Sequence, residues 1–513
     1  MALVFAAGAM QPVARVALTD PPPVPREFRA AWATPILDMG LREWPSTPGL
    51  SPDSQRAEMR ALLAGARDAG LNAVILHVRL AADAMYPTPL APWSAFISGK
   101  SGVGPNPPYD PLAYAVTEAH ARGLQLHAWF NPFRAMLPNF AGSAAPSHVT
   151  RAHASWIRRY GTQRWIDPGE PAARAWSLAS ILDVVRRYDV DGVHIDDYFY
   201  PYRENVTVTR RVGKRRVRVK REIPFPDDAT WRKYGRPRGF TSRDAWRRAN
   251  IDEFVESIYR GVKKIRPSVL VGISPFGIWR PGYPPGVTGL DAYDEIYADS
   301  RRWLREGWLD YIAPQLYWQL GGAQGRFLAL DAWWRTQNPK ARHIWPGLYT
   351  SRTFDPRDAW GIAEIPAQIL AVRDARPDSV DSPGVIHFRL GALLTRQRLL
   401  GATLADGVYS AHALVPAAPW LGSLAPAAPV VSNTAIDAGA GSLDLVVMPG
   451  DSVAVRWWLI QARGRDGRWT SSVQPAGKGT ISIGALKTAD PDEIAVSAIG
   501  LTGVAGPPTL VVR

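Results

Sequence analysis

The chain of 513 residues contains no cysteine. This absence excludes disulfide bonds, thiolate zinc sites, a cysteine nucleophile and a lipid-modified cysteine. Long apolar runs are also missing, so no segment predicts a transmembrane helix. Neither G-x-S-x-G nor H-E-x-x-H occurs, which removes two common signatures of hydrolases. We expect no bound cofactor and no metal ion.

The residues that are present describe an ordinary globular protein with many tryptophans. Hydrophobic residues make up 46% of the chain and charged residues 21%. At roughly 100–200 residues per domain, the length allows several domains or one large barrel with an added module. The 21 tryptophans favour either a large core or stacking on flat rings, so a polysaccharide is a candidate partner.

The formal net charge is +14, which favours association with polyanions. It is equally consistent with a merely arginine-rich composition. Of the polyanions we expect an anionic envelope polymer and no nucleic acid. We also expect the protein to be a monomer.

The first residues, "MALVFAAGAMQPVARVALTDPPPVP", combine a short apolar run, Ala-x-Ala patterns and a Pro-rich stretch. This resembles the tail of a secretory signal, although a positive leading region is missing. We therefore interpret residues 1–27 as a signal-like, Pro-rich segment. The expectation is an exported protein of the periplasm or cell envelope.

Strand-like and helix-like segments alternate from about residue 28 to 395. Short runs that are apolar on both faces are typical of parallel strands covered by helices. They predict strands at 28–36, 72–79, 124–133, 191–199, 269–279, 309–318, 343–350 and 384–390. Cap residues and helical periodicity predict helices at 54–69, 111–122, 171–188, 243–265, 297–306, 322–336, 361–374 and 395–404. This order predicts a (β/α)8 TIM barrel over 28–412. An open doubly wound sheet is the alternative, but no Gly-rich phosphate loop follows the first strand.

Two further segments have their own patterns. Residues 413–430 are rich in Pro and Ala and predict a linker. Short alternating runs separated by turn signals over 431–513 predict a fibronectin type III-like β-sandwich. Within the barrel, 206–223 reads "VTVTRRVGKRRVRVKREI" and predicts a hairpin insertion with cationic exposed faces. It is either a solvated loop or a clamp on an anionic polymer beside the active site.

Polar residues recur near the carboxyl ends of the predicted strands, where barrel enzymes carry their chemistry. Strand alternation places one set of them inward and Asp197 at the rim. Burying so many polar groups is unfavourable unless a site uses them. The inward set is His77, Arg79, His127, Trp129, Asn131, His194, Asp196, Ser274, Gln315, Tyr317, His387 and Arg389.

Three functions fit this set of residues. Glycoside cleavage needs two carboxyl groups, and the many Trp and Tyr residues suit stacking on sugar rings. Metal-dependent hydrolysis of amide or acetyl groups is a rival, because "HIDD" with His77 and His127 offers ligands. A glycan-binding scaffold without catalysis is the third.

Several motifs together resemble the bacterial glycosyl-hydrolase-10-like family. They occur in the order "FRAAWATP", "NAVILHVRLAADAMYPTPLAPWSAFISG", "YDPLAYAVTEAHARGLQLHAWFNPFR", "YDVDGVHIDDYFYPY", "FPDDATWRKYG", "RPSVLVGISPFGIWR" and "LDYIAPQLYWQ". The resemblance covers most of residues 28–400. It implies an exported barrel, often followed by a fibronectin-like module, that hydrolyses bacterial cell-wall glycan lacking stem peptides.

The resemblance also implies functional positions, which we carry over residue by residue. We expect Asp196 to be the nucleophile or base and Asp197 to support it. The general acid is left open among Asp83, Glu204 and Asp299, although Asp83 could merely cap a loop and Asp299 a helix. The expected substrate-binding residues from the resemblance are Arg79, Tyr86, Trp129, Asn131, Arg134, Tyr198, Ser274, Gln315 and Tyr317, and strand alternation adds His127 and His194. The chain departs from the family pattern at His77, where Gln is expected, and at "LAADA" in place of a Gly-containing turn.

Overall fold

The computed structural model describes residues 20–137, 143–212, 215–376, 383–395, 399–437, 442–477, 479–482 and 493–512. The chain divides into two compact units, one of residues 25–424 with 500–504 and one built mainly of residues 425–499 and 505–513. Most of the signal-like N-terminal segment lies outside the described residues. In the described part, no helix is long and apolar enough to cross a membrane.

The first unit is built on one parallel sheet whose strand order is β12-β11-β10-β7-β3-β2-β1-β14-β13. The strands are β1 (Phe28–Ala33), β2 (Ala73–Arg79), β3 (Gln125–Phe130), β7 (Gly192–Ile195), β10 (Leu270–Ile273), β11 (Tyr311–Ile312), β12 (His343–Ile344), β13 (Gly347–Leu348) and β14 (Gly384–His387). Each lies within one of the eight segments predicted as strands.

The sheet curls until its two edges meet in one short segment of chain. The edge strands β12 and β13 are separated by two residues only. In this segment the Trp345 amide donates to the Ile312 carbonyl of β11 at 2.9 Å. The Pro346 carbonyl accepts from the Ile386 amide of β14 at 3.0 Å. Because this one segment bonds to β11 on one side and to β14 on the other, the architecture is TIM-barrel-like, as the alternation predicted.

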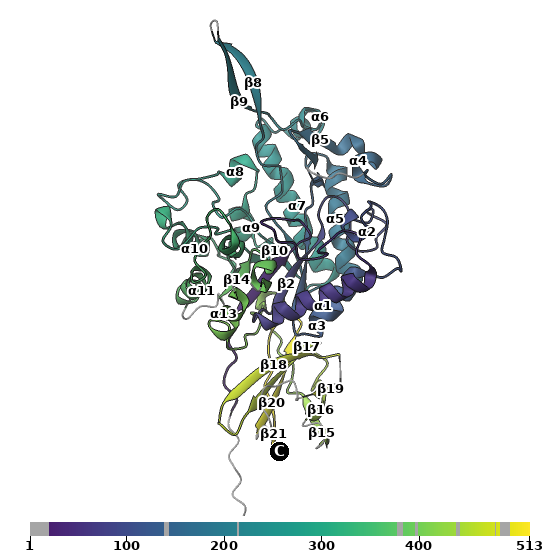
Figure 1. Ribbon diagram of the computed structural model, residues 1–513, viewed down its shortest axis with the longest axis vertical. Helices are drawn as coiled ribbons and strands as arrows, with labels where there is room; N and C mark the ends of the chain where they lie inside the picture. The colour runs from purple at the N-terminus through teal and green to yellow at the C-terminus, as the bar shows by residue number, and fades with distance from the viewer. Residues whose placement is uncertain are drawn as a thin grey trace, which may run out of the picture. The chain divides into compact units, whose positions relative to one another are not determined.

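Helices connect the strands and lie around the sheet (Figure 1). The larger ones are α1 (Pro52–Asp68), α3 (Pro111–His120), α5 (Pro171–Arg187), α7 (Arg243–Ile265), α10 (Arg326–Thr336) and α11 (Glu364–Asp374), with the shorter α9 (Ser300–Glu306) and α13 (Leu400–Asp406). The predicted bounds of α7 are confirmed at both ends. Its start is set by Ser242, whose side chain accepts a hydrogen bond from the Ala245 amide.

Aromatic side chains fill the inside of the barrel, and glycines on neighbouring strands make room for them. A β-carbon on Gly192 would lie 2.5 Å from Nδ1 of His127, and one on Gly272 would lie 1.9 Å from Cζ of Tyr311. Tyr311 in turn hydrogen-bonds to His127 and His194, each at 2.9 Å. The packing of the interior therefore depends on aromatic rings that lie against glycines of neighbouring strands.

We expect Gly272→Ala to destabilise the protein by about 2 kcal/mol or more, because the new methyl group overlaps the Tyr311 ring. Urea denaturation followed by tryptophan fluorescence measures the loss. Gly321→Ala is the matched control, since no atom lies within 4 Å of its added β-carbon. Equal stability of the two variants would contradict this packing.

Strand alternation predicted two inward side chains wrongly. The register between β2 and β3 shifts between His77 and Arg79, and this bulge turns Arg79 toward the helices, where its guanidinium lies 4.3 Å from the Trp176 ring of α5. On β14, Ile386 occupies the inward position. His387 therefore points outward and hydrogen-bonds to Tyr409 at 3.0 Å.

Two insertions leave the barrel at the carboxyl ends of its strands. After β3 comes a small antiparallel sheet of β4 (Arg134–Met136), β5 (Ile157–Tyr160) and β6 (Gln163–Ile166), which the sequence did not predict. After β7, β8 (Asn205–Val212) and β9 (Arg215–Glu222) pair antiparallel. The predicted hairpin is thus confirmed, apart from residues 213–214 at its tip, which lie outside the described residues.

In its described residues, the second unit contains two antiparallel sheets, in the orders β15-β16-β19 and β18-β17-β20-β21. Their strands are β15 (Val430–Asp437), β16 (Ser442–Met448), β17 (Val455–Arg463), β18 (Trp469–Pro475), β19 (Thr480–Ser482), β20 (Glu493–Gly500) and β21 (Thr509–Val512). Both sheets contribute to one buried cluster, which includes Leu445 and Trp458. The fibronectin type III assignment stays a prediction. Of the predicted linker, residues 413–424 belong to the barrel unit.

Candidate active site

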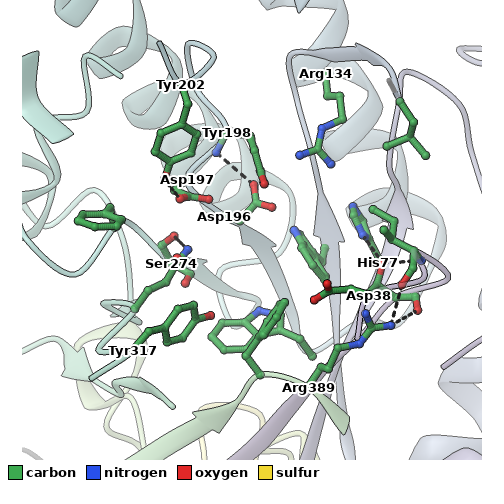
Figure 2. Close-up of a pocket in the computed structure, with 18 of the residues that line it drawn as sticks. Asp38, His77, Arg134, Asp196, Asp197, Tyr198, Tyr202, Ser274, Tyr317 and Arg389 are labelled. Atoms are coloured by element: carbon green, nitrogen blue, oxygen red, sulfur yellow. Dashed lines mark hydrogen bonds between the residues drawn. The ribbon is translucent and has the colours of Figure 1, made fainter. Parts of the chain in front are cut away.

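A cavity of about 740 Å³ opens at the carboxyl ends of the barrel strands (Figure 2). Side chains that end or follow β1, β2, β3, β7, β10, β11 and β14 all reach it. The wall includes Trp32, Asp38, His77, Trp129, Arg134, Asp196, Asp197, Tyr198, Tyr202, Ser274, Phe276, Gln315, Tyr317, Phe388 and Arg389. Its volume is typical of pockets that enclose a small ligand, about 300–1,000 Å³.

Asp196 is held in a fixed orientation at the end of β7. The Asn131 amide donates to both of its carboxylate oxygens, at 2.7 Å each. The Arg134 guanidinium donates to the Asn131 carbonyl at 2.8 Å and lies 3.8 Å from the centre of the Tyr198 ring. This chain of contacts leaves Asp196 few rotamers while keeping it in the cavity wall.

The environment of Asp196 shifts its titration toward neutrality. Burial, and next the negative charge of Asp197, raise the pKa of Asp196 to about 7, against the opposing effects of Arg134 and Asn131. A carboxyl group with such a pKa is present in both the acid and the base form near pH 7. It can therefore donate and accept protons under physiological conditions.

Asp197 lies in the cavity wall and is buried, which corrects its predicted place at the rim. Strand β7 ends at Ile195, so the two aspartates are no longer forced to opposite faces. The Tyr202 hydroxyl donates to Asp197. Burial raises the pKa of Asp197, while hydrogen bonds from Tyr202 and Gln315 oppose the shift. Two adjacent carboxyls with unequal hydrogen bonding are thus brought together.

The pKa of Asp196 predicts a pH-dependent stability. From about pH 4 to about pH 7 the folded protein holds a proton that the unfolded chain has released, so the free energy of unfolding falls as pH rises through this range. The amide of Asp196→Asn does not titrate, so this variant does not lose stability in this way. We expect its stability relative to wild type to rise by about 2 kcal/mol or more between about pH 4 and about pH 8. Urea unfolding at several pH values measures it, and a difference independent of pH would contradict the raised pKa.

Most of the expected substrate-binding residues meet in this one cavity. Trp129, Arg134, Tyr198, Gln315 and Tyr317 line it together with Ser274. Asn131 lies directly behind Asp196. His77 also lines the cavity, stacked on Trp129 with the ring centres 3.8 Å apart. The strand-end rule therefore located the wall of the site.

His127 and His194 lie below the cavity as part of the barrel interior. The ring nitrogens of His194 contact the Tyr311 hydroxyl at 2.9 Å and the Trp32 indole nitrogen at 3.0 Å. Burial lowers the pKa of His127 to about 4. Both histidines are therefore occupied in the core. Within the described ranges, no three His, Asp or Glu residues are grouped so as to hold a metal ion.

The structure does not bring the three general-acid candidates into this cavity. Asp83 accepts from the Ala81 amide at 3.0 Å and lines a neighbouring cavity of about 570 Å³. Asp299 caps α9 by accepting from the Arg302 amide at 3.3 Å. Glu204 accepts from the Gln163 side chain at 2.9 Å.

Arg79 and Tyr86 lie outside the wall of the main cavity as well. Both side chains are buried, and their polar atoms lack hydrogen-bond partners among the described residues. The Tyr86 ring packs edge-on against Tyr188, with the centres 5.7 Å apart. Their burial places them between the barrel and its outer layer.

Sequence reasoning missed several side chains that the structure places in the wall, among them Tyr202 and Asp38. Tyr202 is the last residue of the aromatic run "YFYPY", and Asp38 lies in the loop after β1. That loop is fixed by a buried ion pair between Arg389 and Glu43, and Arg389 also donates to the Ile36 carbonyl at 2.9 Å. Asp38 is exposed and its side chain extends into the cavity (Figure 2). Extending the strand-end search into the loops would have found both.

Comparison with known proteins adds a family and two relatives. The model of the family described as glycosyl hydrolase-like 10 matches residues 27–358. The glycosyl hydrolase YngK of Bacillus subtilis is 36% identical over 436 residues, which are 83% of this chain and 80% of that protein. The glycosyl hydrolase DigH of Escherichia coli K12 is 34% identical over 390 residues, which are 71% of this chain and 82% of that protein.

Solved structures with a similar chain path share little sequence with this protein. The glycoside hydrolase domain of PgaB from Bordetella bronchiseptica is 13% identical, with a TM-score of 0.46, and the match covers 74% of this chain and 98% of that domain.

Proposed function

The chain belongs to the glycosyl hydrolase-like 10 family and is a glycoside hydrolase; from this premise we propose that it cleaves a bacterial cell-wall glycan at the Asp196–Asp197 pair. The observation that carries the proposal is this pair of buried, adjacent carboxyls in a cavity walled by aromatic rings. Glycosidases typically use two carboxyl groups in different protonation states. The raised pKa of Asp196 supplies such a difference.

We assign Asp196 the role of general acid and base, which revises the expected role of nucleophile or base. In its protonated form it donates to the departing glycosidic oxygen, and in its ionised form it activates water. Asp197 is the group that ionises first, because its charge raises the pKa of Asp196 and Tyr202 hydrogen-bonds to it. It is placed to act as a nucleophile or to stabilise positive charge on the sugar ring.

The walls of the cavity support a sugar substrate. Trp129, Tyr198, Phe276, Tyr317 and Phe388 line it and offer apolar faces next to polar groups. This combination suits the flat apolar faces and hydroxyl edges of pyranose rings. Arg134 adds a charged donor beside Asp196, which suits a glycan that carries carboxylate or acetamido groups.

The proposal includes where the enzyme acts. A cell-wall substrate requires export, which the signal-like N-terminal residues support. We retain a fibronectin type III-like sandwich for the second unit, with a role in spacing or binding. Fractionation of cells that express the whole chain tests the location, and retention in the cytoplasm would contradict it.

The direct test is release of new reducing ends from peptide-stripped peptidoglycan. Intact peptidoglycan and unrelated polysaccharides serve as comparison substrates, and each reaction is run with and without a chelator. We expect activity on the stripped glycan that the chelator does not change and that Asp196→Asn loses. Saturable glycan binding without new reducing ends would favour a non-catalytic glycan-binding scaffold. Loss of activity on addition of the chelator would favour metal-dependent hydrolysis.

A further inference from the structure

The hairpin of β8 and β9 extends away from the barrel as a narrow ribbon (Figure 1). Its two strands contain seven Lys and Arg residues and a single acidic one, Glu222. Glu222 pairs at the base of the ribbon with Arg203, at 3.2 Å. The cations along the strands are therefore not balanced by acidic groups of the hairpin itself.

The strand register divides the ribbon into two different faces, because residues directly opposite each other share a face. On one face Thr209 lies opposite Arg218 and Thr207 opposite Lys220, so this face is entirely polar and cationic. On the other face Val208 lies opposite Val219. Both faces carry arginines, as expected, but the second face also carries an apolar patch.

The second face combines an apolar patch with a cationic border. Val206, Val208, Val217 and Val219 alternate along it with Arg210, Arg215 and Arg221. Val217 is 41% exposed, and the three arginines are exposed. A soluble polyanion would be bound by the charges alone. Apolar side chains bordered by arginine are instead typical of segments that lie in the interface of an anionic bilayer.

We propose that the hairpin docks the enzyme on an anionic phospholipid surface, with the valine face against the bilayer. The ribbon is joined closely to the candidate active site, since Tyr202, which contacts Asp197, is three residues before β8. The base is fixed as well, because the Glu204 amide donates to the Tyr160 hydroxyl at 2.9 Å. Docking would hold the cavity close to the membrane and to polymer lying beside it.

Sedimentation of the whole chain with vesicles tests this inference. Vesicles of phosphatidylcholine mixed with phosphatidylglycerol should bind the protein, and vesicles of phosphatidylcholine alone should not. Removing the three cations of the valine face in Arg210→Ser, Arg215→Ser and Arg221→Ser should weaken binding about a hundredfold, from about fivefold per charge. The control removes three exposed cations of the barrel, Arg305→Ser, Lys340→Ser and Arg357→Ser, and should bind like wild type.

A second variant separates a lipid surface from a soluble polyanion. Val206→Thr, Val208→Thr and Val219→Thr keep β-branched side chains and all the charges. We expect this variant to bind polyphosphate like wild type and to bind the anionic vesicles at least tenfold more weakly. Wild-type binding of the vesicles would overturn the proposal in favour of a soluble polyanion. Equal loss in the hairpin and barrel charge variants would overturn it in favour of a general charge effect.

The docking inference stands apart from the chemistry at Asp196. Both hairpin variants leave the cavity wall unchanged, so they should hydrolyse a short soluble glycan at the wild-type rate. If the docking proposal is wrong, only the vesicle experiment will show it. If the proposed hydrolysis is wrong, neither the wild type nor any variant will cleave the glycan.

Discussion

Asp196→Asn is expected to fold normally and to lose at least about a hundredfold in turnover, the usual effect of removing an acid or base that acts in the reaction. The amide has nearly the shape of the carboxyl group and can still accept a hydrogen bond from Asn131. The amide cannot act as a general acid or a general base at neutral pH. Initial rates on peptide-stripped peptidoglycan, with circular dichroism to verify folding, measure the effect.

Asp299→Asn is the matched control for this prediction. Asp299 caps α9, and Asn caps helices as well as Asp does. This variant should therefore keep both its fold and its turnover, although Asp299 was one of the three candidates for the general acid. Near-wild-type activity of Asp196→Asn, or a large loss in Asp299→Asn, would contradict the assignment of the site to the Asp196–Asp197 cavity.

The same assignment gives a direction for the pH profile. Asp196 must be protonated to donate to the leaving group, so kcat/KM should fall as pH rises above about 7, the pKa of that carboxyl. Removing the charge of Asp197 lowers the pKa of Asp196, because that charge is one of the causes of its shift. The fall of kcat/KM on the alkaline side of the pH profile should then begin at a lower pH.

The sequence predicted the barrel well because the signal for it is distributed over many residues. Each strand is a short run that is apolar on both faces, so an error at one position does not change the number of strands predicted. Alternation also located His77, Trp129, Asn131 and Asp196 at the site, since these strands are regular up to that point. Where the backbone is regular, side-chain direction follows from position alone.

Prediction was wrong where the backbone leaves that regularity. A bulge turns Arg79 outward, and the end of β7 lets Asp197 join Asp196 in the cavity. Nothing periodic marks such points in a single sequence. Asp38 and Tyr202 were missed for a related reason, because loop side chains take their direction from tertiary contacts. For the Asp38 loop these are the contacts between Arg389 and Glu43.

The placement of Asp38 raises a mechanistic alternative to be separated from the role of Asp197. Among the described residues, the carboxylates in the cavity wall are Asp38, Asp196 and Asp197. Asp38 comes from the opposite side of the cavity to Asp197 (Figure 2). A carboxylate there could activate water on the face of the sugar opposite to Asp196, which would give inversion, whereas attack by Asp197 would give retention.

Asp197→Asn should lose at least about a thousandfold in turnover if Asp197 is the nucleophile, since removing the attacking group of a covalent mechanism is among the largest single effects. Tyr202→Phe removes only the hydroxyl that donates to Asp197 and should cost about tenfold. In Asp197→Ala, added azide should restore cleavage of a substrate with a good leaving group and form a glycosyl azide. If azide has no effect and Asp38→Asn shows the thousandfold loss instead, then Asp38 is the second carboxyl and the enzyme inverts.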